Sequence, residues 1–432
     1  PGRPAPSRTP KGRMTVAVED VGPAIYEMYA LTWPYSERNH NMSAYESLMD
    51  YPGLVLTPLI AESWTLTPDG ITFKIRKNVP FHDKAYGTVT ADDVVFSYQR
   101  TAAPGTTHTV GQVLQQSYAS YQALDAYTVE MKFKRADIQW SQPHRKTGNP
   151  VLIQSKKMFD EKGANYALLN ENGTGPFRVV EHLADDHINL EAVPNHWRMT
   201  PGFAQVWMFE IPEEASRIAM LKAGQADIVQ IGLPSVKPVQ KISNVRLVEG
   251  KQLGKDGANV YLAGQYYSKA KDDGTPTNRV LDTSLPWIGK PGDAASLEAA
   301  RKVRLAMSMA IDRQVIIDTI LGGYGCPSYV FSTDSCSVLW QDKWKVPYDP
   351  TQAKQLLKEA GYPNGFDFTF FNPTGQSPTR EEIAEALVPM WRAIGARAKM
   401  EKTAYSARRP TMVDRTIKDA WIFGHVDAQL PD

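Results

Sequence analysis

The segment Asp69–Tyr98, DGITFKIRKNVPFHDKAYGTVTADDVVFSY, holds a turn, a strand and a helix in close succession. Asp69-Gly70 is a dipeptide typical of hairpin turns, and the apolar residues after it alternate with polar ones, as in a strand with one buried face. Thr90 and Asp93 match a capping box, which marks the start of a helix. This combination of elements predicts an α/β or α+β protein.

The same patterns recur later in the chain. Alternating apolar residues indicate further strands near Val129–Phe133 and Phe366–Phe370. Asp349-Pro350 is an N-cap and first-turn pair, and Gly361 supplies a left-handed stop, so a helix is predicted between them. Strands and helices therefore alternate irregularly over the whole length.

Length and charge restrict the classes of protein that fit. With 432 residues the chain is too long for one hydrophobic core, so two or three domains are expected. Lys plus Arg number 48 and Asp plus Glu 47, and the charges are interspersed, which does not favour a nucleic-acid partner. No stretch approaches the roughly 18 to 20 apolar residues that a membrane helix needs.

The chain contains two cysteines, Cys326 and Cys336. Their spacing matches neither a CxxC redox motif nor a zinc motif. In an oxidising compartment they would close a short loop, whereas in a cytosolic protein they would be two unrelated buried thiols. The residues between them lack the periodicity that would bury them separately, which favours the disulfide.

Five blocks of short motifs follow one another from about residue 40. They are Ala44–Leu48 with Pro58–Trp64 and Asp69–Arg76, Gly173–Phe177 with Asn195–Trp197, Ala223–Ile228, Val303–Arg313, and Tyr348–Pro363. In this order they resemble the family 5 extracellular solute-binding proteins, which serve importers of peptides, nickel and oligosaccharides. The resemblance covers most of the chain.

The resemblance implies an α/β fold, namely a two-lobed periplasmic-binding-protein fold of type II (cluster C) with an extra inserted domain. Residues 1–43 and 170–253 are expected to form the first lobe, 44–169 the inserted domain, and 254–432 the second lobe. In the family the chain then crosses back to complete the first lobe. This sequence ends at that point, so we expect the C-terminal return segment to be missing.

The resemblance also implies where a solute would lie, between the two lobes. The candidate ligand-binding residues are Trp33, Tyr35, Tyr118, Gln265, Trp421, Phe423, Asp427 and Gln429. Tyr121 is an alternative to Tyr118. A core role remains equally open for Trp421 or Phe423, because the two alternate around Ile422 as in a strand.

The charge of the solute depends on the alignment of the last segment. Peptide-binding members resemble one another in an acidic residue there, which pairs with the amino group of the peptide. Aligned on Pro431-Asp432, that position is Gln429, which favours a sugar-like or otherwise neutral solute because an amide cannot neutralise a buried ammonium. A shift of two residues would give the acidic role to Asp427.

No catalytic motif is found, whether a GxSxG elbow, HExxH, a P-loop or GxGxxG. Because the histidines are scattered, neither a metal site nor a cofactor is expected. We expect an extracytoplasmic or periplasmic receptor, free or lipid-anchored and monomeric, that delivers an oligopeptide, an oligosaccharide or a related conjugate to the permease subunits of an ABC importer. The alternatives are a ligand-sensing or chaperone role on the same scaffold, and a hydrolase that uses the cleft.

Overall fold

The computed structural model describes residues 9–22, 24–30, 41–52, 55–108, 110–137, 139–146, 150–248, 257–266, 281–330, 333–337, 340–374, 377–413 and 416–424. These residues form two compact units. The first holds the described residues up to Ile231 together with Val248, and the second holds Gly232–Leu247 and the described residues from 257 to 424. None of the helices in these ranges has the length and apolar character needed to cross a membrane.

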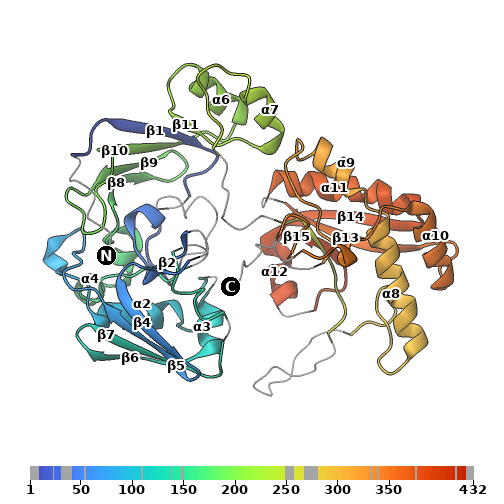
Figure 1. Cartoon of the computed structure of the whole chain (residues 1–432), viewed down its shortest axis with the longest axis horizontal. Helices are drawn as coiled ribbons and strands as arrows, with labels where there is room; N and C mark the ends of the chain where they lie inside the picture. Colours follow the sequence, from blue (N-terminus) through green and yellow to red (C-terminus); the bar gives the residue numbers. More distant parts are fainter. Residues whose placement is uncertain are drawn as a thin grey trace. The chain divides into compact units, whose positions relative to one another are not determined.

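One sheet of the first unit joins the start of the chain to much later segments (Figure 1). Its strands, in spatial order, are β11 (Ile228–Val229), β1 (Arg13–Val18), β10 (Gln205–Glu210), β9 (His187–Ala192) and β8 (Phe177–Leu183). β1 lies parallel to both of its neighbours, and β9 and β8 continue the sheet antiparallel. Since a parallel pair cannot be joined by a hairpin, α6 (Glu214–Lys222) carries the chain from β10 to β11.

The second large sheet of this unit is antiparallel throughout, and α2 packs against β6 and β7. Its strands, in spatial order, are β4 (Ala61–Thr67), β5 (Gly70–Ile75), β7 (Thr128–Phe133) and β6 (Tyr118–Asp125). The other elements of this part are β2 (Met49–Asp50), β3 (Thr57–Pro58), η2 (Lys84–Tyr86), α2 (Ala91–Thr101), α3 (Gly111–Ser117), α4 (Lys156–Lys162) and α5 (Ala164–Leu169). Phe73, Val129 and Met131 are fully buried, so the predicted alternation marks the core face.

The predicted capping box begins α2. Asp93 Oδ2 accepts hydrogen bonds from Thr90 N at 2.8 Å and from Thr90 Oγ1 at 2.9 Å. Its other oxygen accepts from Lys156 N at 2.9 Å, where α4 begins. One buried carboxylate thus ties the starts of two helices together.

Gly173 and Gly175 allow two backbone segments to touch. A Cβ added at Gly173 would lie 2.0 Å from Ala44 O, and one added at Gly175 would lie 2.3 Å from Ser43 O. Gly175 N donates to Ala44 O at 2.8 Å. Only residues without a side chain permit this approach, which accounts for the two glycines in the Gly173–Phe177 block.

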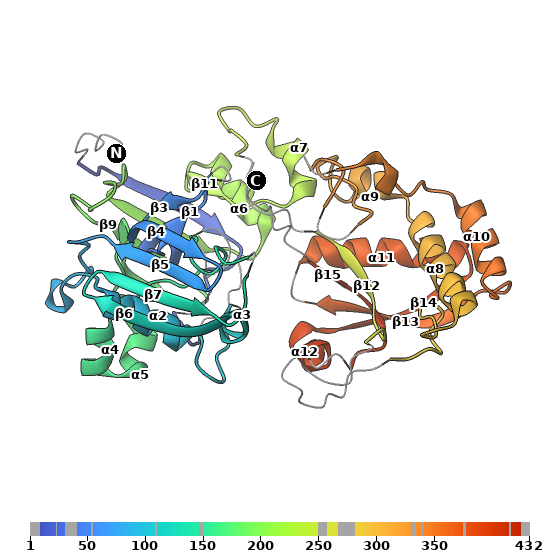
Figure 2. The same cartoon turned by 60° about the horizontal axis from the view of Figure 1, so that its bottom comes forward.

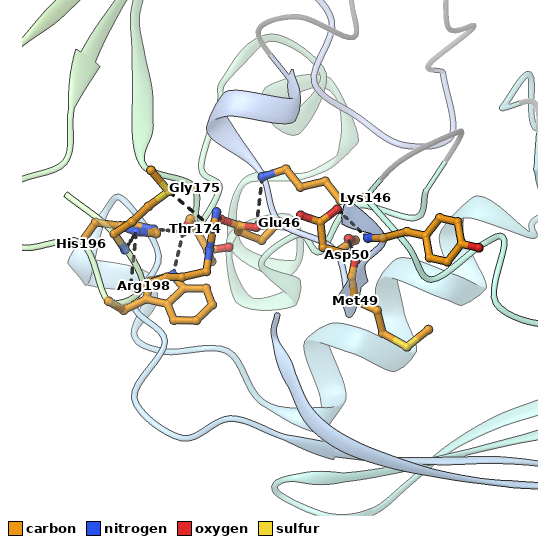
Figure 3. A network of polar contacts seen from close by, with 12 residues as sticks. Glu46, Met49, Asp50, Lys146, Thr174, Gly175, His196 and Arg198 are labelled. Atoms are coloured by element: carbon orange, nitrogen blue, oxygen red, sulfur yellow. Dashed lines mark hydrogen bonds and ion pairs between the residues drawn. The ribbon is translucent and has the colours of Figure 1, made fainter. Parts of the chain in front are cut away.

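The Glu46 carboxylate lies at the centre of a polar network in the first unit (Figure 3). The side chain has no solvent exposure, and its oxygens lie 2.7 Å from Arg198 Nη2 and 3.1 Å from Lys146 Nζ. Its backbone oxygen accepts from Ile153 N at 3.0 Å. Glu46 therefore connects segments that lie about 100 and 150 residues further along the chain.

His144 is buried between two tyrosines beneath the second sheet. Its Nδ1 lies 2.5 Å from Tyr98 Oη and its Nε2 lies 2.9 Å from Tyr118 Oη. Burial lowers the pKa of His144 to about 3. The ring is therefore neutral at neutral pH, with one nitrogen that donates and one that accepts.

The second unit is built on a four-stranded sheet with helices on both faces (Figure 2). Its strands, in spatial order, are β12 (Asn259–Leu262), β15 (Ala420–Phe423), β13 (Phe366–Thr374) and β14 (Ala396–Ala404). β13 lies parallel to β14 and β15, while β12 is antiparallel to β15. The other elements are η3 (Leu233–Ser235), α7 (Val236–Val239), α8 (Ala294–Met309), α9 (Arg313–Thr319), η4 (Asp342–Trp344), α10 (Pro350–Glu359), α11 (Pro378–Ala393) and α12 (Tyr405–Val413).

Successive residues of β13 belong to different cores. Phe370 packs with Trp391 of α11 in the larger cluster, which also contains residues of α8 and α10. Phe371 packs on the opposite face with Met412 of α12 and with Ile417. Both phenylalanines are fully buried, as expected for a parallel sheet that is covered on its two faces.

Within the described residues, the four sheets draw their strands from the three expected segments of the chain, 1–43 with 170–253, 44–169, and 254–432; the middle segment supplies both the β4–β5–β7–β6 sheet and the two-stranded β2–β3 sheet. The compact units follow a different division. They join the first two segments, and they place Gly232–Leu247 with the second unit. The three-domain boundaries stay a prediction.

Replacing Glu46 by Gln is expected to lower the free energy of unfolding by about 3 kcal/mol, because it leaves Arg198 and Lys146 beside a neutral amide. Denaturant unfolding measures the change. Glu191→Gln is the matched control, since Glu191 pairs with Arg178 at 2.7 Å on the exposed surface of the same unit and should be nearly neutral. Equal losses in the two variants would show that the Glu46 network does not stabilise the fold.

Acid should destabilise the first unit through His144. Its folded pKa lies below the unfolded value, so the unfolded chain binds more protons below about pH 6.5, and stability falls as the pH decreases. Between pH 7 and pH 5 the wild type should lose roughly 2 kcal/mol more than His144→Gln, because the other titrating groups cancel in this comparison. Urea unfolding at both pH values tests this, and parallel pH profiles would contradict it.

Candidate functional site

The structure places only some of the expected ligand-binding residues. Trp33, Tyr35, Asp427 and Gln429 lie outside the described residues. Gln265 follows β12, forms an isolated bridge with Leu281, and has an exposed side chain. The remaining three candidates occupy two different settings.

Tyr118 begins β6 and is 4% exposed. Its hydroxyl lies 2.9 Å from His144 Nε2 and donates to Trp140 O at 3.1 Å. Tyr121, the alternative candidate, stacks against it with ring centroids 5.7 Å apart. In this structure Tyr118 is thus a core side chain of the first unit.

Trp421 and Phe423 alternate along β15 with two fully buried residues, Ala420 and Ile422. Both aromatic side chains are partly exposed, and their ring centroids lie 5.6 Å apart. Trp421 also packs against the Phe371 core. Trp421 therefore contacts a core and also retains exposed surface, so it is compatible with both the core role and the ligand-binding role.

Tyr261 extends this aromatic surface from the neighbouring strand. It lies opposite Trp421 in the β12–β15 pair, and the two rings stack with centroids 4.5 Å apart. Arg380, in the first turn of α11, places its guanidinium 5.4 Å from the Phe423 ring centroid. We call these four residues, Tyr261, Trp421, Phe423 and Arg380, the Trp421 wall.

Electrostatics also connect Arg380 with Tyr261. Burial raises the pKa of Tyr261, and the Arg380 cation opposes this increase. The Tyr261 hydroxyl therefore stays neutral near neutral pH and can donate or accept a hydrogen bond. The wall combines flat apolar surfaces with one hydroxyl and one cation.

The topology places the Trp421 wall at an edge of the sheet that is suited to a ligand. From β13 the chain passes through α11 to β14 on one side, and then through α12 to β15 on the other side. Because these three strands are parallel, their carboxyl ends, Thr374, Ala404 and Phe423, lie at the same edge. In open α/β sheets, ligands bind outside the carboxyl ends of strands where the connections diverge in this way.

The second unit also holds the two cysteines, which form a disulfide with Cα atoms 5.8 Å apart. Their sulfurs and an Asp334 carboxylate oxygen lie within 4.8 Å of one another, which is a spacing that could hold a metal ion. Because both sulfurs are used in the disulfide, they do not offer thiolate ligands. This cluster therefore does not fit a metal site while the bond is intact.

Comparison with known proteins identifies the scaffold. The family model of bacterial extracellular solute-binding proteins, family 5 Middle, matches residues 55–432. The chain belongs to this family. Its members are binding proteins and not enzymes, and they act in extracellular or periplasmic space.

Individual members of family 5 are distant in sequence. Heme-binding protein A of Haemophilus influenzae is 27% identical over 385 residues, which cover 79% of this chain and 61% of that protein. The dipeptide-binding protein of Escherichia coli is 26% identical over 392 residues, which cover 84% of this chain and 67% of that protein. The chain thus spans about three fifths to two thirds of the length of these relatives.

A solved member supports the fold. The structure of HbpA2 from Haemophilus parasuis matches with a TM-score of 0.73 and 21% identity, over 96% of this chain and 80% of that one. The expected fold class, an α/β periplasmic-binding-protein fold with two lobes, is confirmed. At this identity the match concerns the fold alone.

Two residues of the Trp421 wall were missed by the sequence reasoning. Tyr261 lies on a short strand, and its partner β15 follows almost 160 residues later, so local alternation carries no sign of the contact. Arg380 lies in a helix that begins at Ser377-Pro378, an N-cap and first-turn pair. The Ser377-Pro378 pair is the signal in the sequence that predicts Arg380 in the first turn of this helix.

Proposed function

We propose that this family 5 protein is an extracytoplasmic receptor of an ABC importer that closes two lobes on a small organic solute. The solute would be an oligopeptide, an oligosaccharide or a related conjugate, which the receptor passes unchanged to the permease subunits. The observation that carries the proposal is the Trp421 wall, a partly exposed aromatic surface with a cation at the carboxyl edge of a parallel sheet.

The chemistry of the wall restricts the solute. Stacked rings offer broad apolar surface at little cost in side-chain entropy, so they favour a solute with a flat or apolar portion. Arg380 is buried, and its positive charge favours a solute with an acceptor or acidic group near that portion. Trp33, Tyr35, Asp427 and Gln429 are proposed as further contacts, and whether Asp427 or Gln429 lies beside the solute would decide between an ammonium and a neutral group.

The names of the relatives agree with this range of solutes without selecting one. They refer to heme and to a dipeptide, both of which combine apolar surface with polar groups. We propose that the receptor acts as a monomer outside the cytoplasm, either free or anchored by a lipid, and that it carries out no chemistry on its solute.

The proposed function predicts thermal stabilisation by a solute of the right class. Protein stripped of solute by unfolding and refolding would be screened with oligopeptides, oligosaccharides, opine-like conjugates and nickel complexes. A solute at about 100 times its dissociation constant adds roughly 2.7 kcal/mol, which raises the melting temperature by a few degrees. The solute recovered afterwards should be chemically unchanged.

Variants locate the binding. Trp421→Ala should weaken the binding of the identified solute about tenfold or more, because it removes the central ring of the wall. Tyr166→Ala is the matched control, since Tyr166 is a 40% exposed aromatic residue on α5 of the first unit and should leave the affinity unchanged. Binding that is unaffected by Trp421→Ala would refute the site, and the absence of any stabilising solute would contradict the proposed function.

A further inference from the structure

A pocket of about 460 Å³ lies within the second unit, beside the start of α9 and the loop that leads from α9 to α10. None of its lining residues belongs to the Trp421 wall. Its volume falls within the roughly 300 to 1,000 Å³ range of small-molecule sites. The pocket could therefore hold a ligand of its own, separate from the solute of the Trp421 wall.

Aromatic side chains form the apolar surface of this pocket. Tyr329 and Trp340 lie with ring centroids 5.7 Å apart at an interplanar angle of 42°. Tyr348, also in the lining, is 53% exposed. Three rings in one pocket offer flat faces to a ring-shaped ligand.

The Tyr329 ring is already supported by a cation. The Arg313 guanidinium lies 4.5 Å from the Tyr329 ring centroid. Arg313 also donates hydrogen bonds to Ser328 O at 2.9 Å and to Ser308 O at 3.0 Å, so its position is fixed by the end of α8 and the disulfide loop. A second cation on this ring would be repelled, so the pocket does not suit a cationic ligand.

The charges in the lining are balanced. Asp312 and Asp342 offer carboxylates, and Arg313 and Lys345 offer cations. Asp312 accepts from Val315 N at 3.1 Å, and Asp342 accepts from Trp340 Nε1 at 3.0 Å. Because the two signs are equal in number, the lining carries no net charge that would favour an anionic ligand.

Neutral polar groups complete the lining. Ser335 supplies a hydroxyl that can donate and accept, and Gln314, whose Nε2 donates to Asp318 Oδ1 at 3.0 Å, supplies its carbonyl oxygen as an acceptor. A ligand that matches this surface is neutral, has one apolar face, and carries several groups that each donate and accept hydrogen bonds. Pyranose rings have these properties, with C–H groups on their faces and hydroxyls around their edge.

We propose that this pocket is a second binding site of the receptor, and that it takes a neutral saccharide ring. The ring would lie against Trp340 and Tyr348, with its hydroxyls bonded to Asp342, Gln314 and Ser335. The saccharide would be either a free sugar or the end of a longer glycan, since both present the same ring.

The disulfide holds one wall of the site. Pro327, Tyr329 and Ser335 lie in the ring closed by Cys326 and Cys336, which are ten positions apart. Within that ring Ser335 N donates to Pro327 O at 3.0 Å. Breaking the covalent closure would let Tyr329 leave its place, so saccharide binding depends on the oxidised form.

The test is a ligand-observed NMR titration of the full chain with glucose, maltose, N-acetylglucosamine and chitotetraose, alongside choline and acetate. At least one saccharide should bind with a dissociation constant below about 10 mM, and neither ion should compete. A preference for chitotetraose over its monosaccharide would indicate a glycan end, and equal binding a free sugar. Binding of choline or acetate in place of saccharides, or of none of the probes, would overturn the proposal.

Variants separate this pocket from the Trp421 wall. Trp340→Ala and Tyr348→Ala should each weaken saccharide binding about tenfold, and the double variant Cys326→Ser with Cys336→Ser should weaken it similarly. Tyr166→Ala, on α5 of the first unit, should leave saccharide binding unchanged, and Tyr348→Ala should leave the binding of the solute found by thermal shift unchanged. The opposite pattern, with saccharide binding lost only in Trp421→Ala, would assign the saccharide to the wall.

The Tyr348→Ala variant is the one least expected to misfold. Its side chain is largely exposed, so its loss should not disturb the core, and circular dichroism can verify the fold of each variant. A folded Tyr348→Ala variant with unchanged saccharide affinity would refute the proposed contact.

Discussion

Parallel strand pairing is the constraint on which both units depend. In the first unit β1 is parallel to both of its neighbours, and in the second unit β13 is parallel to β14 and β15. Parallel partners require crossover helices, so α6, α11 and α12 must lie against their sheets. The crossovers that bury the faces also bring the carboxyl ends of β13 and β15 to one edge, which gives the Trp421 wall its place.

Buried polar contacts hold together segments of the first unit whose backbone path hydrophobic packing alone does not specify. The Glu46 carboxylate pairs with two cations from distant segments, and Gly175 lets a third segment pass against Ser43 and Ala44 (Figure 3).

Two histidines of the first unit show how the surroundings of an imidazole decide its charge. Burial opposes charge on His82, but a hydrogen bond at 2.8 Å to Glu171 raises its pKa, whereas His144 has only neutral tyrosines and its pKa falls.

Local signals in the sequence predicted local structure well. The alternation after Gly70, the Thr90 capping box and the cap at Asp349 each correspond to an observed strand or helix, because these signals act over a few residues. The family blocks predicted the fold for a related reason. Their glycines and caps serve the backbone, as Gly173 and Gly175 do against Ser43 and Ala44.

The candidate site was less predictable, because it is made by contacts between distant segments. Tyr118 lies on a strand whose polar neighbours suggest exposure, yet its hydroxyl is bonded to His144, which follows 26 positions later. Tyr261 meets Trp421 only through the β12–β15 pairing. Trp33 and Gln429 lie outside the described residues, so their roles remain predictions.

The two aromatic surfaces of the second unit differ in what fixes them. Trp421 and Tyr261 occupy paired strands, so their stacking follows from the sheet itself and persists wherever the fold persists. Tyr329 belongs to a loop without regular structure, and its ring is held by the Cys326–Cys336 closure and by the stacked Arg313. The short loop between Cys326 and Cys336 has few apolar contacts of its own. Without the disulfide, the conformational entropy of the open loop would compete with the single contact between Arg313 and the Tyr329 ring. The geometry of the wall therefore follows from the sheet, whereas the position of Tyr329 in the pocket depends on the disulfide and on Arg313.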